Sequence, residues 1–201
     1  MPKINAATID EHKEQTRTAL LEAGAASFVS LGLAGTSFGA LADRAGIART
    51  TVYEYFPNKE AVLADLIYER LPPVIERVLD GLPEDDAVNT LIEIMRRALS
   101  GFYEYPIETA LLFKVSRELA KPERDAVWSV LQPIRNEILT LCKDLVDSGR
   151  VADADPESLG VTIGDHVIGG IDELSERGKQ DAEVVIASRT GFLRRGLGVC
   201  D

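Results

Sequence analysis

Apolar residues recur along most of this chain at spacings of three and four, which place them on one face of an α-helix. Runs that alternate apolar and polar residues, the mark of strands, are absent, and glycines and prolines fall between the longer periodic segments. The most regular segment is 123–148, whose apolar stripe consists of Val127, Leu131, Ile134, Ile138, Leu141 and Leu145. Pro133 should kink this helix, because proline lacks the amide hydrogen that a helix bond needs. The pattern predicts an all-α protein.

Breakers and capping residues divide the chain into about nine helices. Gly32 is a stop signal for the first helix, and Thr36 or Ser37 can cap the second. Gly81 and Pro83 mark a boundary, after which the composition changes. We therefore expect an N-terminal domain over 1–80, which includes a connecting helix, and a C-terminal helical bundle over 81–201. The predicted helices are 9–31, 37–45, 48–56, 57–79, 85–103, 107–120, 123–148, 156–177 and 181–196.

The segment 36–60 carries the most specific local signal. Ala42 is small enough for a second helix to cross closely, and Gly46 supplies the positive φ of a sharp turn between helices. Ile47 and Val52 then give the next short helix an inward face. These features predict a helix-turn-helix inside a three-helix module, a motif whose second helix enters the major groove of DNA.

The composition is that of a globular protein, with 45% apolar and 27% charged residues among 201. No stretch approaches the roughly 20 consecutive apolar residues of a membrane span, and the N-terminal region carries no signal-peptide pattern. Cys142 and Cys200 form no disulfide framework, so free thiols in a reducing cytoplasm are expected. We expect a cytoplasmic protein without a membrane partner.

The net charge of −11 is unusual for a DNA-binding protein, but it is unevenly distributed. Residues 1–60 hold six Lys or Arg against seven Asp or Glu, whereas residues 61–201 hold 16 against 26. The acidity therefore lies almost wholly outside the predicted helix-turn-helix. Such a near-neutral end attracts DNA weakly, because affinity for the phosphate backbone scales with the charges that are neutralised. The charge disfavours nonspecific nucleic-acid binding and still permits a site-specific dimer.

Residues 16–67 resemble the DNA-binding region of the TetR family of bacterial transcriptional regulators. The residues that match in the family's order and spacing are Leu20, Leu21, Phe28, Gly32, Thr36, Leu41, Ala42, Ala45, Gly46, Ile47, Val52, Tyr53, Phe56, Lys59 and Glu60. The other two-thirds of the chain match only in helix number and length. The resemblance implies a homodimeric repressor that binds a palindromic operator. It also implies that the repressor releases the operator when a small molecule enters the C-terminal domain.

The resemblance further implies which residues contact DNA. Arginine can donate two hydrogen bonds to a guanine edge, threonine methyls can pack on thymine methyls, and helix N-termini attract phosphate. Tyr55 is equally compatible with half-buried packing, and Lys59 with a charged helix start. The predicted DNA contacts are Thr36, Ser37, Arg49, Thr50, Thr51, Tyr53, Tyr55 and Lys59.

Three positions depart from the family's pattern. Gly39 stands where many relatives carry a contact residue, so one contact with DNA is missing there. Glu54 places a carboxylate near DNA, and Ala48 replaces the usual serine cap of the recognition helix. These departures affect the operator sequence and the affinity, and they leave the fold unchanged.

A second group of residues suggests a binding cavity. Large aromatic and apolar side chains concentrate in the first part of the C-terminal region, with a few hydroxyl and indole donors among them. Such a lining favours a hydrophobic or aromatic inducer over a sugar or an ion. Plain core packing is the alternative, and a lone histidine on a helix is commonly structural. The predicted ligand-binding residues are Met95, Leu99, Phe102, Tyr103, Phe113, Trp128, Leu131 and His166.

The last two predicted helices suggest a homodimer interface over 156–177 and 181–197. Gly160 and Gly164 are four residues apart, a spacing that allows helix backbones to approach closely. A helix-turn-helix that binds an operator usually needs two copies about one DNA turn apart. Packing within one chain is the alternative explanation. The apolar residues concerned are Leu159, Ile163, Val167, Ile171, Leu174, Val184, Val185, Phe192 and Leu193.

Two other functions stay open. A small all-α enzyme has little support, because the sequence lacks a metal-spaced His/Cys set and a Gly-rich phosphate loop, and His12 and His166 are far apart. We accordingly expect no catalytic residues, no cofactor and no metal. A helix-turn-helix that serves as a protein-interaction module would suit the acidity and Glu54. Sequence-specific protection of DNA distinguishes a regulator from both.

Overall fold

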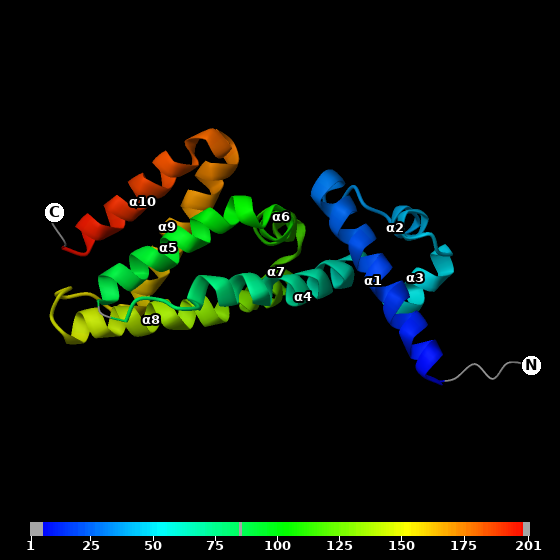
Figure 1. Cartoon of the computed structure of the whole chain (residues 1–201), viewed down its shortest axis with the longest axis horizontal. Helices are drawn as coiled ribbons and strands as arrows, with labels where there is room; N and C mark the ends of the chain where they lie inside the picture. Colours follow the sequence, from blue (N-terminus) through cyan, green and yellow to red (C-terminus); the bar gives the residue numbers. More distant parts are fainter. Residues whose placement is uncertain (1–5, 85, 199–201) are drawn as a thin grey trace, which may run out of the picture. The chain divides into compact units, whose positions relative to one another are not determined.

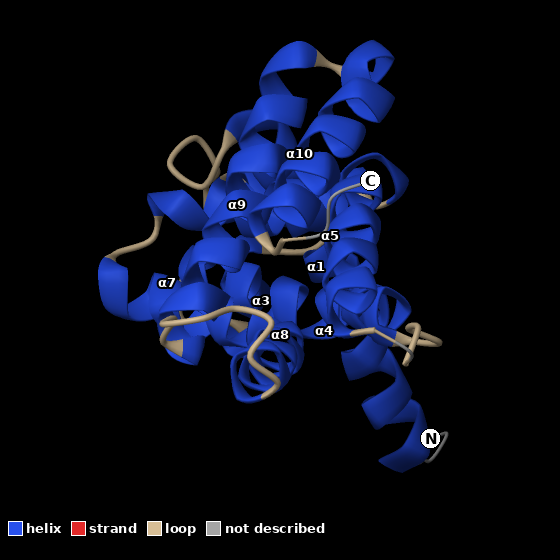
Figure 2. Cartoon of the chain, turned by 90° about the vertical axis from the view of Figure 1, so that its left-hand side faces the viewer, coloured by secondary structure: helices blue, strands red, loops and turns tan. Residues whose placement is uncertain are grey.

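A computed structural model describes residues 6–84 and 86–198 (Figure 1). Over these residues the chain forms ten α-helices, three short 3₁₀ turns and no strand (Figure 2). The α-helices are α1 (Ala6–Leu31), α2 (Phe38–Ala45), α3 (Arg49–Tyr55), α4 (Lys59–Leu79), α5 (Ala87–Glu104), α6 (Pro106–Phe113), α7 (Lys121–Trp128), α8 (Gln132–Asp147), α9 (Pro156–Arg177) and α10 (Ala182–Gly196). The 3₁₀ turns are η1 (Val115–Glu118), η2 (Ser129–Leu131) and η3 (Lys179–Asp181). The predicted all-α fold class is confirmed, and Cys200 lies outside the described residues.

The helices form two compact units, and neither unit is a single stretch of the chain. The first unit consists of the described residues up to Leu71 together with Ile107–Val130. The second consists of Pro72–Pro106 and the described residues from Leu131 onward. The predicted boundary between residues 80 and 81 does not coincide with this division, because 107–130 groups with the N-terminal helices.

An apolar core holds the first unit together. Leu20 and Phe28 of α1, Leu41 of α2, Val52 of α3 and Leu63 of α4 are all fully buried. Each occupies an inward position that the apolar spacing of its helix predicts. Burial of this kind contributes about 1.5–3 kcal/mol for each large apolar side chain. The short helices α2 and α3 are therefore held by their inner faces, which leaves their outer faces available.

Close approach and ion pairs join α1 to α4. A Cβ at Gly24 would lie 2.9 Å from the Val62 Cγ1 atom, so the absence of a side chain lets the helices come together. Arg17 pairs with Asp65 at 2.7 Å, and a further ion pair links α4 back to α1. These contacts give α1 and the first half of α4 one fixed arrangement.

Helix α4 continues from the first unit into the second. It begins at Lys59 and not at Pro57 as predicted, because the Asn58 Oδ1 atom accepts a hydrogen bond from the Ala61 amide at 2.8 Å and caps the helix. Pro72 and Pro73 lie inside the helix, where the first unit ends. Each lacks an amide hydrogen, so two successive helix hydrogen bonds are missing at this point.

The core of the second unit lies among α5, α8, α9 and α10. Met95 and Leu99 of α5, Cys142 of α8 and Leu174 of α9 are fully buried. A Cβ at Gly170 of α9 would lie 2.7 Å from the Leu99 Cδ2 atom, so the glycine permits a close approach of α9 to α5. Burial raises the pKa of the Cys142 thiol to about 11, and the thiol is free and protonated at neutral pH.

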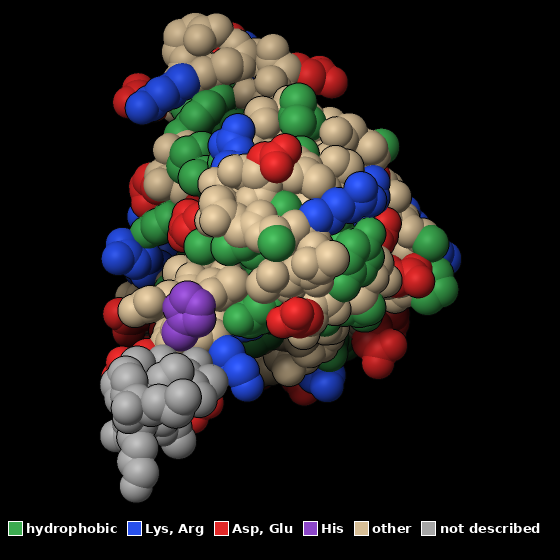
Figure 3. All heavy atoms as spheres, turned by 90° about the vertical axis from the view of Figure 1, so that its right-hand side faces the viewer, with side chains coloured by type: hydrophobic (Ala, Val, Ile, Leu, Met, Phe, Trp, Pro, Cys, Tyr) green, Lys and Arg blue, Asp and Glu red, His purple; other side chains and the backbone are tan. Residues whose placement is uncertain are grey.

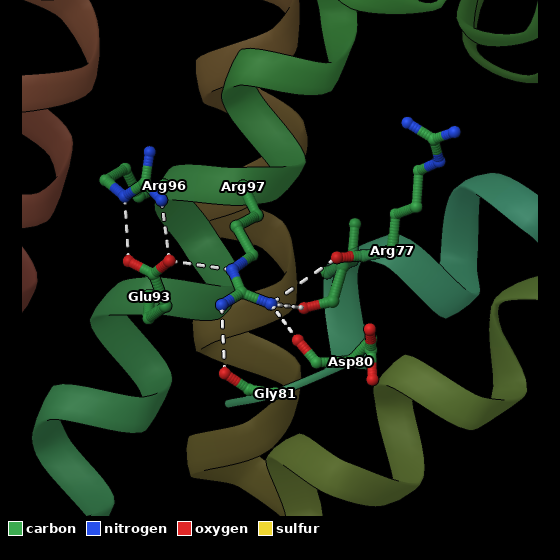
Figure 4. Close-up of polar contacts among 7 residues, drawn as sticks. Arg77, Asp80, Gly81, Glu93, Arg96 and Arg97 are labelled. Carbon is green, nitrogen blue, oxygen red and sulfur yellow. Dashed lines mark hydrogen bonds and ion pairs between the residues drawn. The ribbon is translucent and has the colours of Figure 1, made fainter. Parts of the chain in front are cut away.

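A cluster of charged side chains holds the end of α4 against α5 (Figure 4). The Arg97 guanidinium donates to the backbone carbonyl oxygens of Arg77, Asp80 and Gly81, where the last turn of α4 leaves them without helix partners. Its Nε atom donates to Glu93 at 2.7 Å, and Glu93 also accepts two hydrogen bonds from Arg96. Arg97 therefore adds side-chain donors to a helix end that Gly81, with φ of +56°, also terminates.

The predicted helix over 123–148 is two helices and not one kinked helix. α7 ends at Trp128, η2 follows, and α8 begins at Gln132. Pro133 lies in the first turn of α8, where its missing amide hydrogen costs nothing. The predicted helix over 107–120 is likewise divided, into α6 and η1. In both segments the apolar spacing continues across the break, so spacing alone did not reveal it.

The described residues contain no helix that combines the length and the apolar character needed to cross a bilayer.

Candidate nucleic-acid interface

The turn between α2 and α3 is built as the sequence predicts. Ser37 is the N-cap of α2, and its hydroxyl accepts from the Ala40 amide at 3.2 Å. Gly46 ends the helix with φ of +70°, and the Ile47 amide donates to the Ala42 carbonyl oxygen at 3.0 Å. A side chain at Gly46 would meet no atom within 4 Å, so the backbone conformation is what favours glycine there.

Helix α3 presents an apolar face inward and a polar face outward. Val52 is fully buried, and Phe56 follows it as the buried C-cap. Arg49 and Thr50 are exposed, and so is Tyr53 at 55% of its surface. These three residues, each with a hydrogen-bonding tip, are therefore exposed together with the Glu54 carboxylate on a short helix whose inner face fixes it to the unit. This is the arrangement that major-groove reading requires.

Tyr53 is exposed and yet held in place. Its ring lies 4.8 Å from the Phe38 ring, centroid to centroid, in an edge-to-face contact. Phe38 is buried at the start of α2, so the contact ties the outer face of α3 to the fixed part of the motif. Thr51 and Tyr55 are half-buried. Both remain predicted DNA contacts, and a smaller fraction of each is exposed than of Arg49, Thr50 or Tyr53.

Two of the predicted contacts have structural partners in the turn between α1 and α2. Thr36 is only 3% exposed, and its hydroxyl donates to the Gly32 carbonyl oxygen at 2.8 Å. A buried and bonded hydroxyl cannot reach a phosphate, so the structure argues against Thr36 as a contact. The Lys59 ammonium donates to the carbonyl oxygens of Leu33, Ala34 and Thr36, at 2.7, 3.4 and 3.3 Å. These bonds indicate that Lys59 stabilises the turn between α1 and α2.

Sequence reasoning missed Glu118, which acts on the same turn. Its carboxylate accepts from the amides of Leu33 at 3.1 Å and Ala34 at 2.7 Å. No local pattern predicts this contact, because more than 80 residues separate the partners along the chain. Glu118 and Lys59 together satisfy amides and carbonyls of one short turn.

Charge on this side of the molecule is sparse and mixed. Figure 3 views it from the side on which α2 and α3 lie in Figure 1, and the basic side chains stand among acidic ones. The composition of residues 1–60 agrees with this view. A surface of this kind neutralises few phosphates, so base contacts must supply a large share of any specific binding.

The helix-turn-helix matches a known family model. Residues 20–66 match the model described as bacterial regulatory proteins, tetR family. The chain is also 30% identical over 142 residues to an uncharacterized HTH-type transcriptional regulator, YhgD, of Bacillus subtilis strain 168. That alignment covers 69% of this chain and 73% of YhgD. The chain belongs to the TetR family. It is a regulatory protein and not an enzyme.

Solved structures agree with the TetR fold over nearly the whole chain. A structure of the transcriptional regulator FadR from Bacillus subtilis in complex with stearoyl-CoA superposes with a TM-score of 0.74 at 18% identity, over 92% of this chain and 99% of that one. A structure of AibR in complex with isovaleryl coenzyme A and operator DNA gives a TM-score of 0.69 at 18% identity, over 88% and 97% of the two chains. At this identity the likeness shows the fold alone.

In this TetR-family chain the predicted ligand-binding residues are divided between the two units. Phe113 and Trp128 belong to the first, where their rings are in edge-to-face contact at 5.9 Å. The others belong to the second unit. There Met95 and Leu99 are fully buried, which is what the alternative of core packing predicts for them. Leu131 is half-buried in the second unit.

Two polar members of the predicted ligand set have partners inside the second unit. The Tyr103 hydroxyl donates to the Leu174 carbonyl oxygen at 2.8 Å. The His166 Nε2 atom lies 3.1 Å from the Arg189 carbonyl oxygen, and its Nδ1 atom lies 3.3 Å from the Arg189 Nη1 atom. Because a carbonyl oxygen only accepts, Nε2 carries the proton and Nδ1 accepts from the guanidinium. Arg189, and not the neighbouring Asp165, is the partner of this histidine.

The predicted dimer helices α9 and α10 have one inward and one outward face. Val185 and Leu193 of α10 are buried with Ile163, Ile171 and Leu174 of α9, so much of the predicted stripe packs inside the unit. Three large apolar side chains point outward: Val161 is 64% exposed, Val184 58% and Phe192 63%. We call these three residues the outer apolar face.

The glycines of α9 have different neighbours. A Cβ at Gly160 would approach Ile138 of α8, and one at Gly169 would approach the Arg189 guanidinium of α10. A Cβ at Gly164 would meet nothing within 4 Å. Most of the glycine stripe therefore serves packing within the unit, and Gly164 is its open member.

Proposed function

We propose that this TetR-family protein is a ligand-responsive repressor that binds a palindromic operator as a homodimer. The observation that carries the proposal is the outer face of α3, where Arg49, Thr50 and Tyr53 are exposed above the buried Val52. Helix-turn-helix proteins read bases from this position. Ser37, Thr51 and Tyr55 complete the proposed DNA contacts. A protein that acts on operator DNA works in the cytoplasm of a bacterium.

The second copy is proposed to dock on the outer apolar face. Val161, Val184 and Phe192 would otherwise remain in water, and Gly164 leaves room for a close approach between helices. Two copies joined there would present two α3 helices to successive major grooves. Mutual burial of three large apolar side chains on each copy gives the contact an apolar centre, which is typical of homodimers.

The inducer is proposed to be a small hydrophobic or aromatic molecule. The aromatic content of the predicted ligand set supports this class. The similar structures of FadR and AibR, which hold coenzyme A thioesters of a long and a short acyl chain, support it further. Binding acts by favouring a spacing of the two α3 helices that no longer fits DNA.

The DNA-binding proposal is tested by selecting duplexes from a random pool and measuring the affinity of the selected sequence by gel shift. Arg49→Ala should weaken specific binding by about 1–3 kcal/mol and relax the preference at one base position. Arg135→Ala, which removes an exposed arginine of α8, is the matched control and should leave the affinity unchanged. An equal loss on all sequences would assign Arg49 to the phosphate backbone.

Failure to enrich any sequence, at any salt concentration, would contradict the repressor and favour a protein-interaction module. Once a duplex is in hand, stearoyl-CoA and isovaleryl-CoA are the first probes for the inducer. Release of the duplex by either supports the hydrophobic class. Release by a sugar or an ion instead would overturn it.

A further inference from the structure

The turn that joins α1 to α2 is held from two sides by opposite charges. The Glu118 carboxylate accepts from the amides of Leu33 and Ala34, while the Lys59 ammonium donates to three carbonyl oxygens of the same turn. Hydrogen bonds to charged groups are about twice as strong as neutral ones. The turn therefore has a defined geometry although Ala34 and Gly35 are exposed.

Gly32 shows how closely Glu118 approaches. Its φ is +75°, and a Cβ there would lie 2.7 Å from the Glu118 Oε1 atom. Glycine at this position thus permits the left-handed backbone conformation and leaves space for the Glu118 carboxylate. A side chain at Gly32 would displace Glu118. The contact therefore depends on both residues, which are far apart in the sequence.

The held turn leads directly into the DNA-reading helices. Thr36 bonds back to Gly32 inside it, and Ser37, the next residue, caps α2. α2 in turn supports α3 through the buried Leu41 and through the contact of Phe38 with Tyr53. A shift of the turn therefore changes where α2 starts and where the exposed Tyr53 lies.

At its other end, Glu118 belongs to the segment that carries the tryptophan. Ser116, two residues earlier, is fully buried in η1. Its hydroxyl accepts from the Trp128 Nε1 atom at 2.9 Å and itself donates to the Leu112 carbonyl oxygen. The Trp128 ring also contacts Phe113. One short 3₁₀ turn, buried at Val115 and Ser116 and exposed at Glu118, thus connects the indole to the carboxylate.

We propose that Glu118 is a positioning residue that couples the surroundings of Trp128 to the start of α2. A molecule that displaces Trp128 or Phe113 moves η1, and Glu118 passes the movement to the turn at 32–34. The proposal rests on the proposed DNA-binding function. It adds a link that runs through the Glu118 side chain and the turn at 32–34, and not along α4. By reciprocity, DNA binding to α3 must change the affinity for such a molecule, and through Glu118 we expect it to change the surroundings of Trp128 as well.

This reciprocity permits a test that needs no inducer, because Trp128 is the single tryptophan of the chain. The full-length protein is titrated with the duplex selected by the wild type, and tryptophan emission is recorded together with DNA occupancy. We expect the emission of the wild type to change in step with occupancy. In Glu118→Gln, which retains one acceptor oxygen and loses the charge, most of this change should disappear at equal occupancy.

Two variants separate the contact from charge and from folding. Glu123→Gln removes the same charge from an exposed site on α7, five residues before Trp128, and should behave as the wild type does. Glu118→Asp keeps the charge but shortens the reach, and it should resemble Glu118→Gln. Hydrogen exchange of the Ala34 amide should be about tenfold faster in both Glu118 variants, since a charge-assisted bond is lost.

The outcomes discriminate clearly. An unchanged emission in the wild type at full occupancy, or an undiminished change in Glu118→Gln, overturns the coupling while the DNA-binding function stands. A loss in Glu123→Gln equal to that in Glu118→Gln also overturns it, because charge alone would then explain the effect. Failure to select any duplex contradicts the proposed function and the coupling with it.

Discussion

The two units differ in what they expose. On α3 the exposed side chains are Arg49, Thr50, Tyr53 and Glu54, each with a hydrogen-bonding tip. On α9 and α10 three of the exposed side chains, Val161, Val184 and Phe192, are large and apolar and have none. A polar face gains little from a protein partner that cannot satisfy it, and an apolar face gains most from burial. This difference is the basis for the two proposed partners: DNA for the first unit and a second copy for the second.

The units also differ in how charged side chains are used. In the first, Glu118 and Lys59 hold a turn, and the turn determines where a DNA-reading helix starts. In the second, Arg97 and Arg189 hold helices to one another: Arg97 binds the last turn of α4, and Arg189 bonds to Glu173 across α9 and α10. Charged side chains hold helices together in both units, as Arg17 and Asp65 do in the first, and in the first unit they also fix a turn that precedes α2.

The largest expected effect concerns the outer apolar face. Phe192→Glu should raise the dissociation constant of the dimer roughly 30-fold or more, because a central aromatic side chain commonly contributes 2 kcal/mol or more to an interface. Sedimentation equilibrium over a range of protein concentrations measures this. Operator binding should weaken as dimers are lost.

Leu31→Glu is the matched control, since Leu31 is also exposed, at 58%, but belongs to the first unit. It should leave dimerisation unchanged. If Phe192→Glu still dimerises like the wild type, the assignment of an apolar partner to the second unit is wrong. Equal dissociation of the dimer in Phe192→Glu and Leu31→Glu would show that the exposed apolar side chains of the two units do not differ in their contribution to dimerisation.

A smaller effect is expected from packing inside the second unit. Gly170→Ala inserts a methyl group against the buried Leu99, at 2.7 Å before relaxation, whereas Gly101→Ala in α5 inserts one at an ordinary contact distance of 3.9 Å from the Tyr105 Cδ2 atom. Both changes replace a glycine inside a helix, so their difference isolates the clash. Gly170→Ala should be less stable than Gly101→Ala by about 1–3 kcal/mol in urea unfolding. Equal stabilities would show that α9 and α5 adjust freely.

The smallest effect tests the charged cluster at the end of α4. Hydrogen bonds from Arg96, with a further contribution from Arg97, lower the pKa of Glu93 to about 2. The carboxylate therefore adds stability above its unfolded pKa of about 4.5, and this is lost as the pH falls toward 2. Glu93→Gln should cost less than about 1 kcal/mol at pH 7, because Arg96 is half-exposed.

The difference in unfolding free energy between the wild type and Glu93→Gln should narrow as the pH falls below about 4.5. Glu76→Gln, an exposed carboxylate on α4, serves as the control and should show no such narrowing. A gap that stays constant from pH 7 to pH 3 would mean that Glu93 acts through packing and not through its charge.

Local signals accounted for α2 and α3 of the first unit. Ser37 and Gly46 act within one helical turn of the residues they terminate, so their roles are visible in a short stretch of sequence. The inward and outward positions of α3 follow from spacing alone. The same reasoning failed at residues 129–131, because the apolar stripe continues through a break that the change of unit imposes.

Long-range contacts were beyond local reasoning. Thr36, Lys59 and Glu118 are polar residues whose partners are backbone atoms. Every residue has the same backbone groups, so the sequence does not indicate which side chain will bond to them. The glycines of α9 have four different surroundings: Ile138 at Gly160, open space at Gly164, the Arg189 guanidinium at Gly169 and Leu99 at Gly170. Burial likewise distinguished Phe192 from Leu193, which a helical pattern alone places only one step apart.

The amino-acid sequence by itself determined the all-α fold, the helix-turn-helix and the outward residues of α3, because each depends on neighbours within a few positions. Only the tertiary structure showed which polar side chains of the motif are exposed and which have partners inside the unit. It removed Thr36 from the reading surface, gave Lys59 internal partners and joined Glu118 to a turn far away in the chain. The physical reason is that a buried or exposed hydrogen-bonding group is satisfied by whatever the fold brings near it, and sequence spacing does not encode that proximity.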